Sequence, residues 1–350
     1  MSRVVRFESP GNVTVVEARD EELAPSDVRI ATIYSGISAG TELSYFRGTN
    51  PYFGKHWDPD HRIFRQVGGA SLAYPVDGKG YEEVGVIVEV GDEAGDVVPG
   101  DLVWGKWGHR SSAVKPAEYA RARQLPAGTN PILGVFSQIG AIALNVVLDA
   151  DIHVGETVAV FGLGVCGQIV AQLARLNGGG VIAVDPHLGR RKTAESLGAS
   201  HTVDADDGQV GERIRELTGG RGADVALEVT GSYRALHEAV RSVSYSARVV
   251  AAGFFQGEGT GLALGDEFHH NRIDLKCSQI SGVSPHLSYR WNDERLQRTV
   301  MDLATSGRLG LEQLVTDVLP VERVAEAFEL LECSRDRVLQ VVLRFEDGAG

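Results

Sequence analysis

The stretch T-V-A-V-F-G-L-G-V-C-G-Q-I-V-A-Q-L-A-R-L, residues 157–176, decides the fold of this chain of 350 residues. It opens with an apolar run typical of a buried parallel strand, and residues 165–176 form an apolar run of helical length. Between the two runs, Gly162, Gly164 and Gly167 make the pattern G-x-G-x-x-G. A strand that turns through such glycines into a helix predicts a dinucleotide-binding βα unit.

Each glycine of this pattern has a physical role in the predicted site. Gly162 allows the tight turn, Gly164 lets the backbone approach a pyrophosphate, and Gly167 lets the helix pack close to the strand. The helix that begins at Val165 would hold the phosphate charge with its first backbone N–H groups and its dipole. The alternative is a glycine turn that serves packing alone.

The next strand, residues 181–185, ends in an acidic residue. Asp185 follows the glycine pattern by about 20 residues, where dinucleotide-binding proteins place the carboxylate that meets the ribose hydroxyls. A carboxylate there would repel a 2′-phosphate, so the expected cofactor is NAD rather than NADP. Arg190 and Arg191 lie nearby in the sequence and weaken this preference slightly.

The rest of the second half repeats the alternation of strand and helix. A helical run lies at 190–199, and further apolar runs typical of strands lie at 223–231, 248–253 and 275–282. Such alternation predicts a parallel sheet with right-handed crossovers.

The first half follows a different pattern, in which glycine and proline separate short β-like runs at close intervals. Examples are 28–36, 83–91 and 101–105. This pattern predicts an all-β, barrel-like unit, and a helical run and a strand close the chain at 322–331 and 338–345. We therefore predict an α/β protein with a substrate domain at 1–148 and 290–350 and a dinucleotide domain at 149–289.

Composition excludes several classes of partner. The formal net charge of −13 does not suit nucleic acid or an anionic membrane. By this pattern no stretch approaches the roughly 18 apolar residues that span a bilayer, and the N-terminus lacks a signal-peptide pattern. The 3 cysteines are far apart, which suits a reducing cytoplasm better than a disulfide framework. We expect a cytoplasmic protein.

Further motifs carry a resemblance to a known family. They are G-I-S-A-G-T-E at 36–42, G-Y-E-E-V-G-V-I-V-E-V-G at 80–91, V-P-G-D-L-V at 98–103 and E-V-T-G-S at 228–232. With the glycine pattern, they make the chain resemble the medium-chain dehydrogenase/reductase superfamily over nearly its whole length. The resemblance implies a GroES-like β-barrel catalytic domain, a Rossmann doubly wound parallel sheet and hydride transfer with NAD.

Zinc-dependent members of that superfamily hold their catalytic metal with residues that this chain does not match. Ala39 falls where their cysteine stands and Tyr81 where their histidine stands, while Glu82 keeps their acid. Near the place of the third ligand only Ser137 and Gln138 are polar. A catalytic zinc takes three protein ligands among thiolate, imidazole and carboxylate. We therefore predict no metal and a zinc-free branch, loosely similar to bacteriochlorophyllide-type dehydrogenases.

The resemblance also implies catalytic residues. Thr41 would hydrogen-bond the substrate oxygen, a role that needs no metal. Glu82 is a candidate base, directly or through Tyr81 or water, and Tyr81 is a candidate donor to the substrate oxygen. The structural alternatives are a carboxylate that satisfies a backbone group or an arginine for Glu82, and packing for Tyr81.

Two histidine-containing loops compete for the role of proton relay. His61 ends H-W-D-P-D-H at 56–61, which also fits a metal site, a lid or a solvated loop. His270 lies in D-E-F-H-H-N-R at 266–272, a segment that the resemblance places near a subunit interface. An interfacial role for His270 is therefore as open as a catalytic one.

By the same resemblance, later segments of the Rossmann domain approach the cofactor. The residues expected there are Thr230, Gly253, Phe254, Ser278 and Ile280. Trp57, Trp104, Trp107 and Tyr45 offer aromatic walls for a ring-shaped substrate, and the alternative for such scattered aromatics is packing in the core.

The expected function is zinc-independent oxidoreduction of a secondary alcohol or ketone with NAD, on a sugar, cyclitol or other polyhydroxylated ring. Three alternatives stay open: a redox-neutral epimerase with tightly held NAD, an NADPH-type enone or quinone reductase, and a silent dinucleotide-binding protein. The resemblance implies a homodimer or tetramer.

Overall fold

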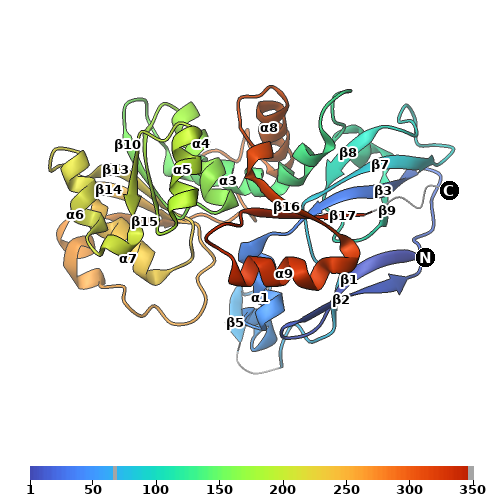
Figure 1. The fold of residues 1–350 in the computed structure, drawn as a ribbon, viewed down its shortest axis with the longest axis horizontal. Helices are drawn as coiled ribbons and strands as arrows, with labels where there is room; N and C mark the ends of the chain where they lie inside the picture. The colour runs from blue at the N-terminus through green and yellow to red at the C-terminus, as the bar shows by residue number, and fades with distance from the viewer. Residues whose placement is uncertain (66–68, 346–350) are drawn as a thin grey trace. The chain divides into compact units, whose positions relative to one another are not determined.

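The computed structural model describes residues 1–65 and 69–345 and divides into two compact units (Figure 1). Unit 1 comprises Met1–Gln138 and Glu312–Gly350, and unit 2 comprises Ile139–Leu311. Residues 139–148 and 290–311, which the sequence pattern assigns to the substrate domain, therefore group with the dinucleotide unit. Their packing explains this, because a Cβ added to Gly140 would lie 2.3 Å from Val300.

Unit 2 is built on the parallel sheet that the sequence predicts. Its strands lie side by side in the order β12-β11-β10-β13-β14-β15. Their bounds are β10 Thr157–Phe161, β11 Gly180–Asp185, β12 His201–Asp204, β13 Ala223–Glu228, β14 Val243–Ala251 and β15 Asp274–Cys277. The strand order reverses between β10 and β13, and such sheets bind their ligands at the carboxyl ends of the strands at this reversal.

Helices cover the two faces of this sheet. Their bounds are α3 Ser137–Ala150, α4 Val165–Leu176, α5 Leu188–Ser196, α6 Val210–Leu217, α7 Tyr233–Ser242 and α8 Asp293–Thr305, with short turns η3 Ala205–Asp207 and η4 Leu264–Phe268. One face of the sheet packs on α6 and α7 through buried side chains such as Phe161, Ile214 and Leu236. The bounds of β10 and α4 coincide with the runs that the sequence assigns to them.

One helical stretch differs from the sequence expectation about membranes. Among the described residues, Pro131–Ala150 is long and apolar enough to cross a bilayer by length and composition. The expectation that no stretch approaches this length is therefore wrong. The stretch is η2 Pro131–Phe136 followed by α3, and 72% of its apolar window is buried inside the fold, as in the core helix of a globular protein.

Unit 1 is rich in β-structure. One sheet has the order β2-β1-β6, a second has the order β16-β17-β3-β7-β8 with β9 also paired to β3, and β4 pairs with β5. An isolated bridge pairs Val4 of the first sheet with Arg110, which precedes β9 of the second. The bounds are β1 Ser2–Ser9, β2 Asn12–Ala18, β3 Asp27–Gly36, β4 His56–Asp58, β5 Ile63–Arg65, β6 Val76–Asp77, β7 Glu83–Val90, β8 Leu102–Gly105, β9 Ser112–Pro116, β16 Val315–Pro320 and β17 Gln340–Arg344.

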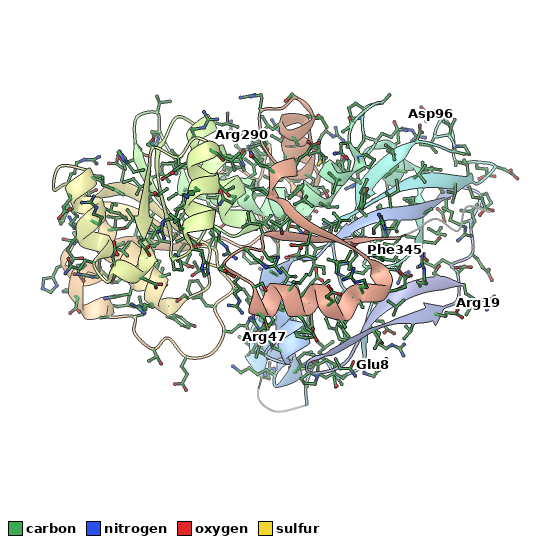
Figure 2. The ribbon with its side chains drawn as sticks, viewed as in Figure 1. Glu8, Arg19, Arg47, Asp96, Arg290 and Phe345 are labelled. Carbon is green, nitrogen blue, oxygen red and sulfur yellow. The ribbon has the colours of Figure 1, made fainter. Side chains whose placement is uncertain are left out.

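The C-terminal segment completes the core of unit 1. Helix α9 buries Val324, Ala327, Phe328 and Leu331, the spacing of an amphipathic helix. Phe345, inside the unit in Figure 2, belongs to the same hydrophobic cluster, whereas Arg19 and Asp96 extend from its edges. The other helical segments are α1 Ala39–Arg47, α2 Ala117–Arg121, η1 Pro51–Phe53, η5 Glu312–Leu314 and η6 Val321–Arg323, and α9 spans Val324–Cys333.

Candidate active site

The glycine turn between β10 and α4 is packed as the sequence predicts. Gly162 has φ +93°, and a Cβ on it would lie 2.4 Å from Thr230. A Cβ on Gly167 would lie 1.8 Å from the carbonyl oxygen of Gly162. The first glycine therefore supplies the turn and the third allows the helix to approach the strand.

Gly164 differs from its neighbours because the protein itself does not require glycine there. It is the N-cap of α4, which begins at Val165, with φ −67° and ψ −174°, a conformation open to any residue. The nearest atom to an added Cβ would be Nη1 of Arg190, at 3.9 Å. The missing side chain instead leaves the first turn of α4 accessible to a bulky anion, so these residues fit a bound pyrophosphate.

Asp185 lies against the glycine turn, where the sequence places it. Its buried carboxylate accepts hydrogen bonds from the backbone N–H groups of Leu163, at 2.8 Å, and His187, at 2.9 Å. Nη1 of Arg190 lies 3.8 Å from Oδ2 of Asp185, whereas Arg191 pairs with Asp204 at 2.7 Å. An acid and a guanidinium are thus both next to the glycine turn.

The carboxyl end of β13 gathers more of the expected cofactor residues. Glu228 accepts hydrogen bonds from the N–H and hydroxyl of Thr230 and from the N–H of Gly231. A Cβ on Gly231 would lie 2.6 Å from the carbonyl oxygen of Phe254, and one on Gly253 would lie 2.0 Å from the nitrogen of Gly231. Burial raises the pKa of Glu228 to about 7, although these donors oppose the rise.

Ser278 and Ile280 follow the last strand of the sheet. The Ser278 N–H donates to the carbonyl of Ala251 at 3.0 Å, and its hydroxyl accepts from the amide of Asn145 at 3.4 Å. Ser278 is therefore tied to the carboxyl end of β14. Ile280 is half-buried in the loop beyond it.

In unit 1, Thr41 and Tyr81 are brought together with a third hydroxyl. The Tyr81 hydroxyl donates to Oγ1 of Thr41 at 3.1 Å and also hydrogen-bonds Oγ of Ser38. We call Ser38, Tyr81 and Thr41 the hydroxyl chain. Burial and the neighbouring Glu82 raise the pKa of the Tyr81 phenol, so it stays a neutral donor.

Glu82 lies beside the hydroxyl chain in sequence, yet its carboxyl group turns elsewhere. The side chain is buried and its carboxyl group lies near the amide of Gln340, whereas no hydrogen bond joins it to the hydroxyl chain among the described residues. Gly36 makes room for it, because a Cβ there would lie 2.7 Å from Oε2 of Glu82. Burial, with Glu42 and Glu83, raises its pKa well above its ordinary value. A proton relay from Glu82 through Tyr81 therefore lacks a hydrogen bond in this structure.

A second set of polar side chains is buried in unit 1 next to Ser38 of the hydroxyl chain. Nε2 of His109 lies 2.5 Å from Oε2 of Glu42, and its Nδ1 lies 2.6 Å from the hydroxyl of Ser35. Ser35 in turn donates to Oε1 of Glu83 at 3.1 Å. We call Glu42, His109, Ser35 and Glu83 the buried network, since each is at most 1% exposed.

The two predicted histidines lie in other surroundings. His61 is exposed on the β4–β5 hairpin and hydrogen-bonds Asp58 at 3.1 Å. Backbone and side-chain donors from His61 and Arg65 hold the pKa of Asp58 at about 2. His270, in unit 2, is exposed and hydrogen-bonds the carbonyl of Asp266 at 3.0 Å.

Two of the predicted aromatic walls are core residues. Trp104 is 2% exposed and Trp107 is 6% exposed, and the indole N–H of Trp107 donates to Thr32 at 2.9 Å. The interpretation of these two tryptophans as substrate walls is therefore wrong.

Comparison with known proteins agrees with this geometry. The zinc-binding dehydrogenase family profile matches residues 165–296. The D-guloside 3-dehydrogenase of Escherichia coli K12 is 30% identical over 327 residues, which cover 91% of this chain and 93% of that protein. The chain belongs to the medium-chain dehydrogenase/reductase superfamily. It is an oxidoreductase that acts on CH–OH groups.

Solved structures share the fold of this dehydrogenase. A structure described as a zinc-binding dehydrogenase from Sinorhizobium meliloti 1021, bound to NADP, has TM-score 0.76 and 22% identity and covers 98% of this chain and 99% of its own. An alcohol dehydrogenase from Escherichia coli CFT073, complexed with NADH, has TM-score 0.77 and 22% identity, with the same 98% and 99% coverage.

The family name raises the question of whether this dehydrogenase has the donors for zinc. Among the described residues, no group of three His, Cys, Asp or Glu side chains is placed to hold a metal ion. At the position that Ala39, Tyr81 and Glu82 occupy, Glu82 alone is a usual zinc ligand, and a neutral phenol and an alanine do not complete the set. The residues present do not fit a catalytic zinc.

Sequence reasoning missed the buried network and Ser38. Glu42 and Glu83 lie inside the motifs quoted above, next to Thr41 and Glu82, so proximity in sequence was an available signal. His109 carried no such signal. It stands alone in W-G-H-R, and only the pairing of distant segments brings it to Glu42.

Proposed function

We propose that this dehydrogenase oxidises a secondary alcohol on a sugar or other polyhydroxylated ring, with NAD as the hydride acceptor and without zinc. The observation that carries the proposal is the hydroxyl chain at Thr41, which offers a substrate oxygen a metal-free partner. The similarity to a D-guloside 3-dehydrogenase over most of both chains supports a sugar ring as the substrate class.

The direction of the hydrogen bonds explains how the hydroxyl chain would act. Tyr81 donates to Oγ1 of Thr41, which leaves the Thr41 hydrogen free to point at a substrate oxygen. Hydrogen bonds in such a chain polarise one another, so Thr41 becomes a stronger donor. It would stabilise the alkoxide character that develops as the carbinol C–H is broken, and bulk water would take the hydroxyl proton that the oxidation releases.

The dinucleotide would be held by unit 2. The N-terminus of α4 and the glycine turn would bind the pyrophosphate, and Asp185 would accept the ribose hydroxyls. When bound, nicotinamide supplies the acceptor carbon for the hydride. Relatives of this fold carry NADP or NADH, and Asp185 is the residue that favours NAD here.

A hydroxyl-deletion series tests the role of the hydroxyl chain. Thr41→Val should lower kcat on a glycoside or cyclitol by about 100-fold, the usual effect of removing one oxyanion donor, and leave the NAD dissociation constant unchanged. Tyr81→Phe should lower kcat less, because Thr41 keeps its own hydrogen. The measurement is reduced nicotinamide formed by purified protein with a panel of ring and open-chain alcohols.

Tyr74→Phe is the matched control for the tyrosine. Tyr74 is half-buried in the same unit and its hydroxyl donates to the carbonyl of Tyr45, so its loss removes a tyrosine hydrogen bond that does not belong to the hydroxyl chain. Kinetics should be unchanged in this variant. An unchanged single-turnover rate in Thr41→Val would remove Thr41 from the mechanism, and NAD retained without net reduction would indicate a redox-neutral reaction instead.

Elemental analysis tests zinc independence separately. Protein purified without a tag should contain close to zero zinc per subunit and keep its activity after treatment with a chelator. One zinc per subunit, lost together with activity, would overturn the zinc-independent part of the proposal and leave the dehydrogenase assignment standing.

A further inference from the structure

The start of helix α1 has an unusual cap. Ser38 is the N-cap residue, and serine is common there because its hydroxyl usually accepts a hydrogen bond from the first helical turn. Here the Ser38 side chain makes no capping bond and contacts Tyr81 instead. The Ser38 hydroxyl therefore belongs to the hydroxyl chain and does not cap the helix.

Glu42 satisfies a backbone group at the start of α1, where the Ser38 hydroxyl makes no capping bond. Its Oε1 accepts from the backbone N–H of Ser38 at 2.8 Å, which fixes the N-cap residue from inside the helix. The other carboxyl oxygen, Oε2, faces Nε2 of His109 at 2.5 Å. A single buried carboxylate therefore joins the N-cap of α1 to an imidazole that lies 67 residues further along the chain.

The partners of His109 indicate that both ring nitrogens carry a hydrogen. The Ser35 hydroxyl donates to Oε1 of Glu83 at 3.1 Å, and Glu83 also accepts from the backbone N–H groups of Trp107 at 2.6 Å and Glu82 at 3.1 Å, although burial raises its pKa. The Ser35 oxygen then accepts from Nδ1–H of His109, while Nε2–H donates to Glu42. Burial opposes the charged ring, but Glu42 and Glu83 outweigh it and raise the pKa of His109.

Gly80 leaves space for the His109 imidazole because it has no side chain. Gly80 has φ +119°, and a Cβ there would lie 2.8 Å from Cε1 of His109 and 3.0 Å from Oε1 of Glu83. Gly80 is the residue directly before Tyr81, so the same short segment presents the phenol and leaves room for the histidine.

We propose that the buried Glu42–His109 pair is a positioning device for the hydroxyl chain. Glu42 holds the N-cap of α1, so the Ser38 hydroxyl stays on Tyr81, and the His109 ring holds the Glu42 carboxyl group in this orientation. Among the described residues neither side chain hydrogen-bonds the Thr41 hydroxyl, and both act through Ser38. The expected effects on turnover rest on the proposed function, whereas the contacts among Glu42, His109, Ser38 and Tyr81 do not depend on it.

Glu42→Gln is the decisive variant because it keeps the shape and the acceptor for Ser38 but removes the charge. The new amide NH₂ would face Nε2 of His109, which must then lose its hydrogen, and Ser38 is expected to loosen from Tyr81. We expect kcat to fall at least tenfold with the NAD dissociation constant unchanged. Glu89→Gln is the control, since Glu89 forms a surface ion pair with Arg29 at 2.8 Å in the same unit.

A double-mutant cycle with Ser38→Ala separates positioning from general stability. If Glu42 acts through the Ser38 hydroxyl, Glu42→Gln should lower kcat little further once that hydroxyl is gone. Effects on kcat that multiply, or a Glu42→Gln variant with wild-type kcat, would overturn the proposal.

Nuclear magnetic resonance gives a readout that does not depend on turnover. With isotope-labelled histidine and tyrosine, the His109 ring should hold both hydrogens at neutral pH in the wild type and lose one in Glu42→Gln, and the Tyr81 signal, assigned with Tyr81→Phe, should shift. If the wild type turns over no alcohol of the panel, the proposed function fails and these two signals alone decide the positioning role. Unmoved signals would contradict it.

Discussion

The Asp185 carboxylate lies at the end of β11 with a guanidinium beside it, and this pair bears on the choice of cofactor. A negative charge repels a 2′-phosphate, whereas Arg190, whose Nη1 lies 3.8 Å from Oδ2 of Asp185, would attract it. We predict that Asp185→Asn raises the affinity for NADP relative to NAD by about tenfold, or about 1.4 kcal/mol. Asparagine can accept from only one of the two backbone N–H groups that Asp185 now accepts from, so thermal unfolding of the variant is measured beside the titration. Titration of both dinucleotides against each protein measures the ratio.

Arg190→Ala in the Asp185→Asn background is the matching control. It should take back most of the gain for NADP and leave NAD nearly unaffected, because NAD has no 2′-phosphate. A ratio that Asp185→Asn leaves unchanged would mean that the carboxylate serves the glycine turn alone.

The β10–α4 unit allows packing and binding to be separated with two glycines of one turn. In Gly167→Ala the new methyl would lie 1.8 Å from the Gly162 carbonyl, so the helix must move and stability should fall by roughly 1–3 kcal/mol. In Gly164→Ala the methyl meets Arg190 at 3.9 Å, so stability should change by about 0.5 kcal/mol or less while NAD affinity drops at least about tenfold. Thermal unfolding and dinucleotide titration on both variants give the comparison. Equal loss of stability in the two would contradict it.

Buried acids in both units make the folded protein less stable as the pH rises. Burial raises the pKa values of Glu82 and Glu83 in unit 1 and brings that of Glu228 in unit 2 to about 7. The folded protein thus binds more protons than the unfolded chain above about pH 4.5. The pKa of His109 is raised too, so the stability it contributes is present below about pH 6.5 and lost as pH rises through the folded pKa. We therefore predict lower stability at pH 8 than at pH 5.5.

Glu228→Gln isolates one part of this dependence. The stability that the Glu228 carboxyl contributes is present below about pH 4.5 and is lost as pH rises to about 7, a loss on the order of 3 kcal/mol over the full window. The variant should therefore show a smaller difference between thermal unfolding at pH 5.5 and at pH 8 than the wild type. An equal difference in both proteins would exclude Glu228 as a contributor.

The sequence alone determined the dinucleotide unit. Glycines at fixed offsets, an apolar strand, an apolar helix and an acid about 20 residues on are local features, and local sterics and hydrogen bonding impose the same βα turn wherever they occur. Gly162, Gly167 and Asp185 accordingly lie where the pattern predicts. The motifs also named Thr41 and Tyr81 as candidates, but not the hydrogen bond between them.

Tertiary structure alone decided what surrounds Thr41. Ser38 faces Tyr81 rather than its own helix, and Glu42 reaches His109, because β3 pairs with both β7 and β9 and so brings segments near residues 38, 81 and 109 together. Glu82 adjoins Tyr81 in the chain, yet no hydrogen bond joins its carboxyl group to the hydroxyl chain among the described residues. Contacts of this kind depend on strand pairing over long sequence separations, which no local pattern records.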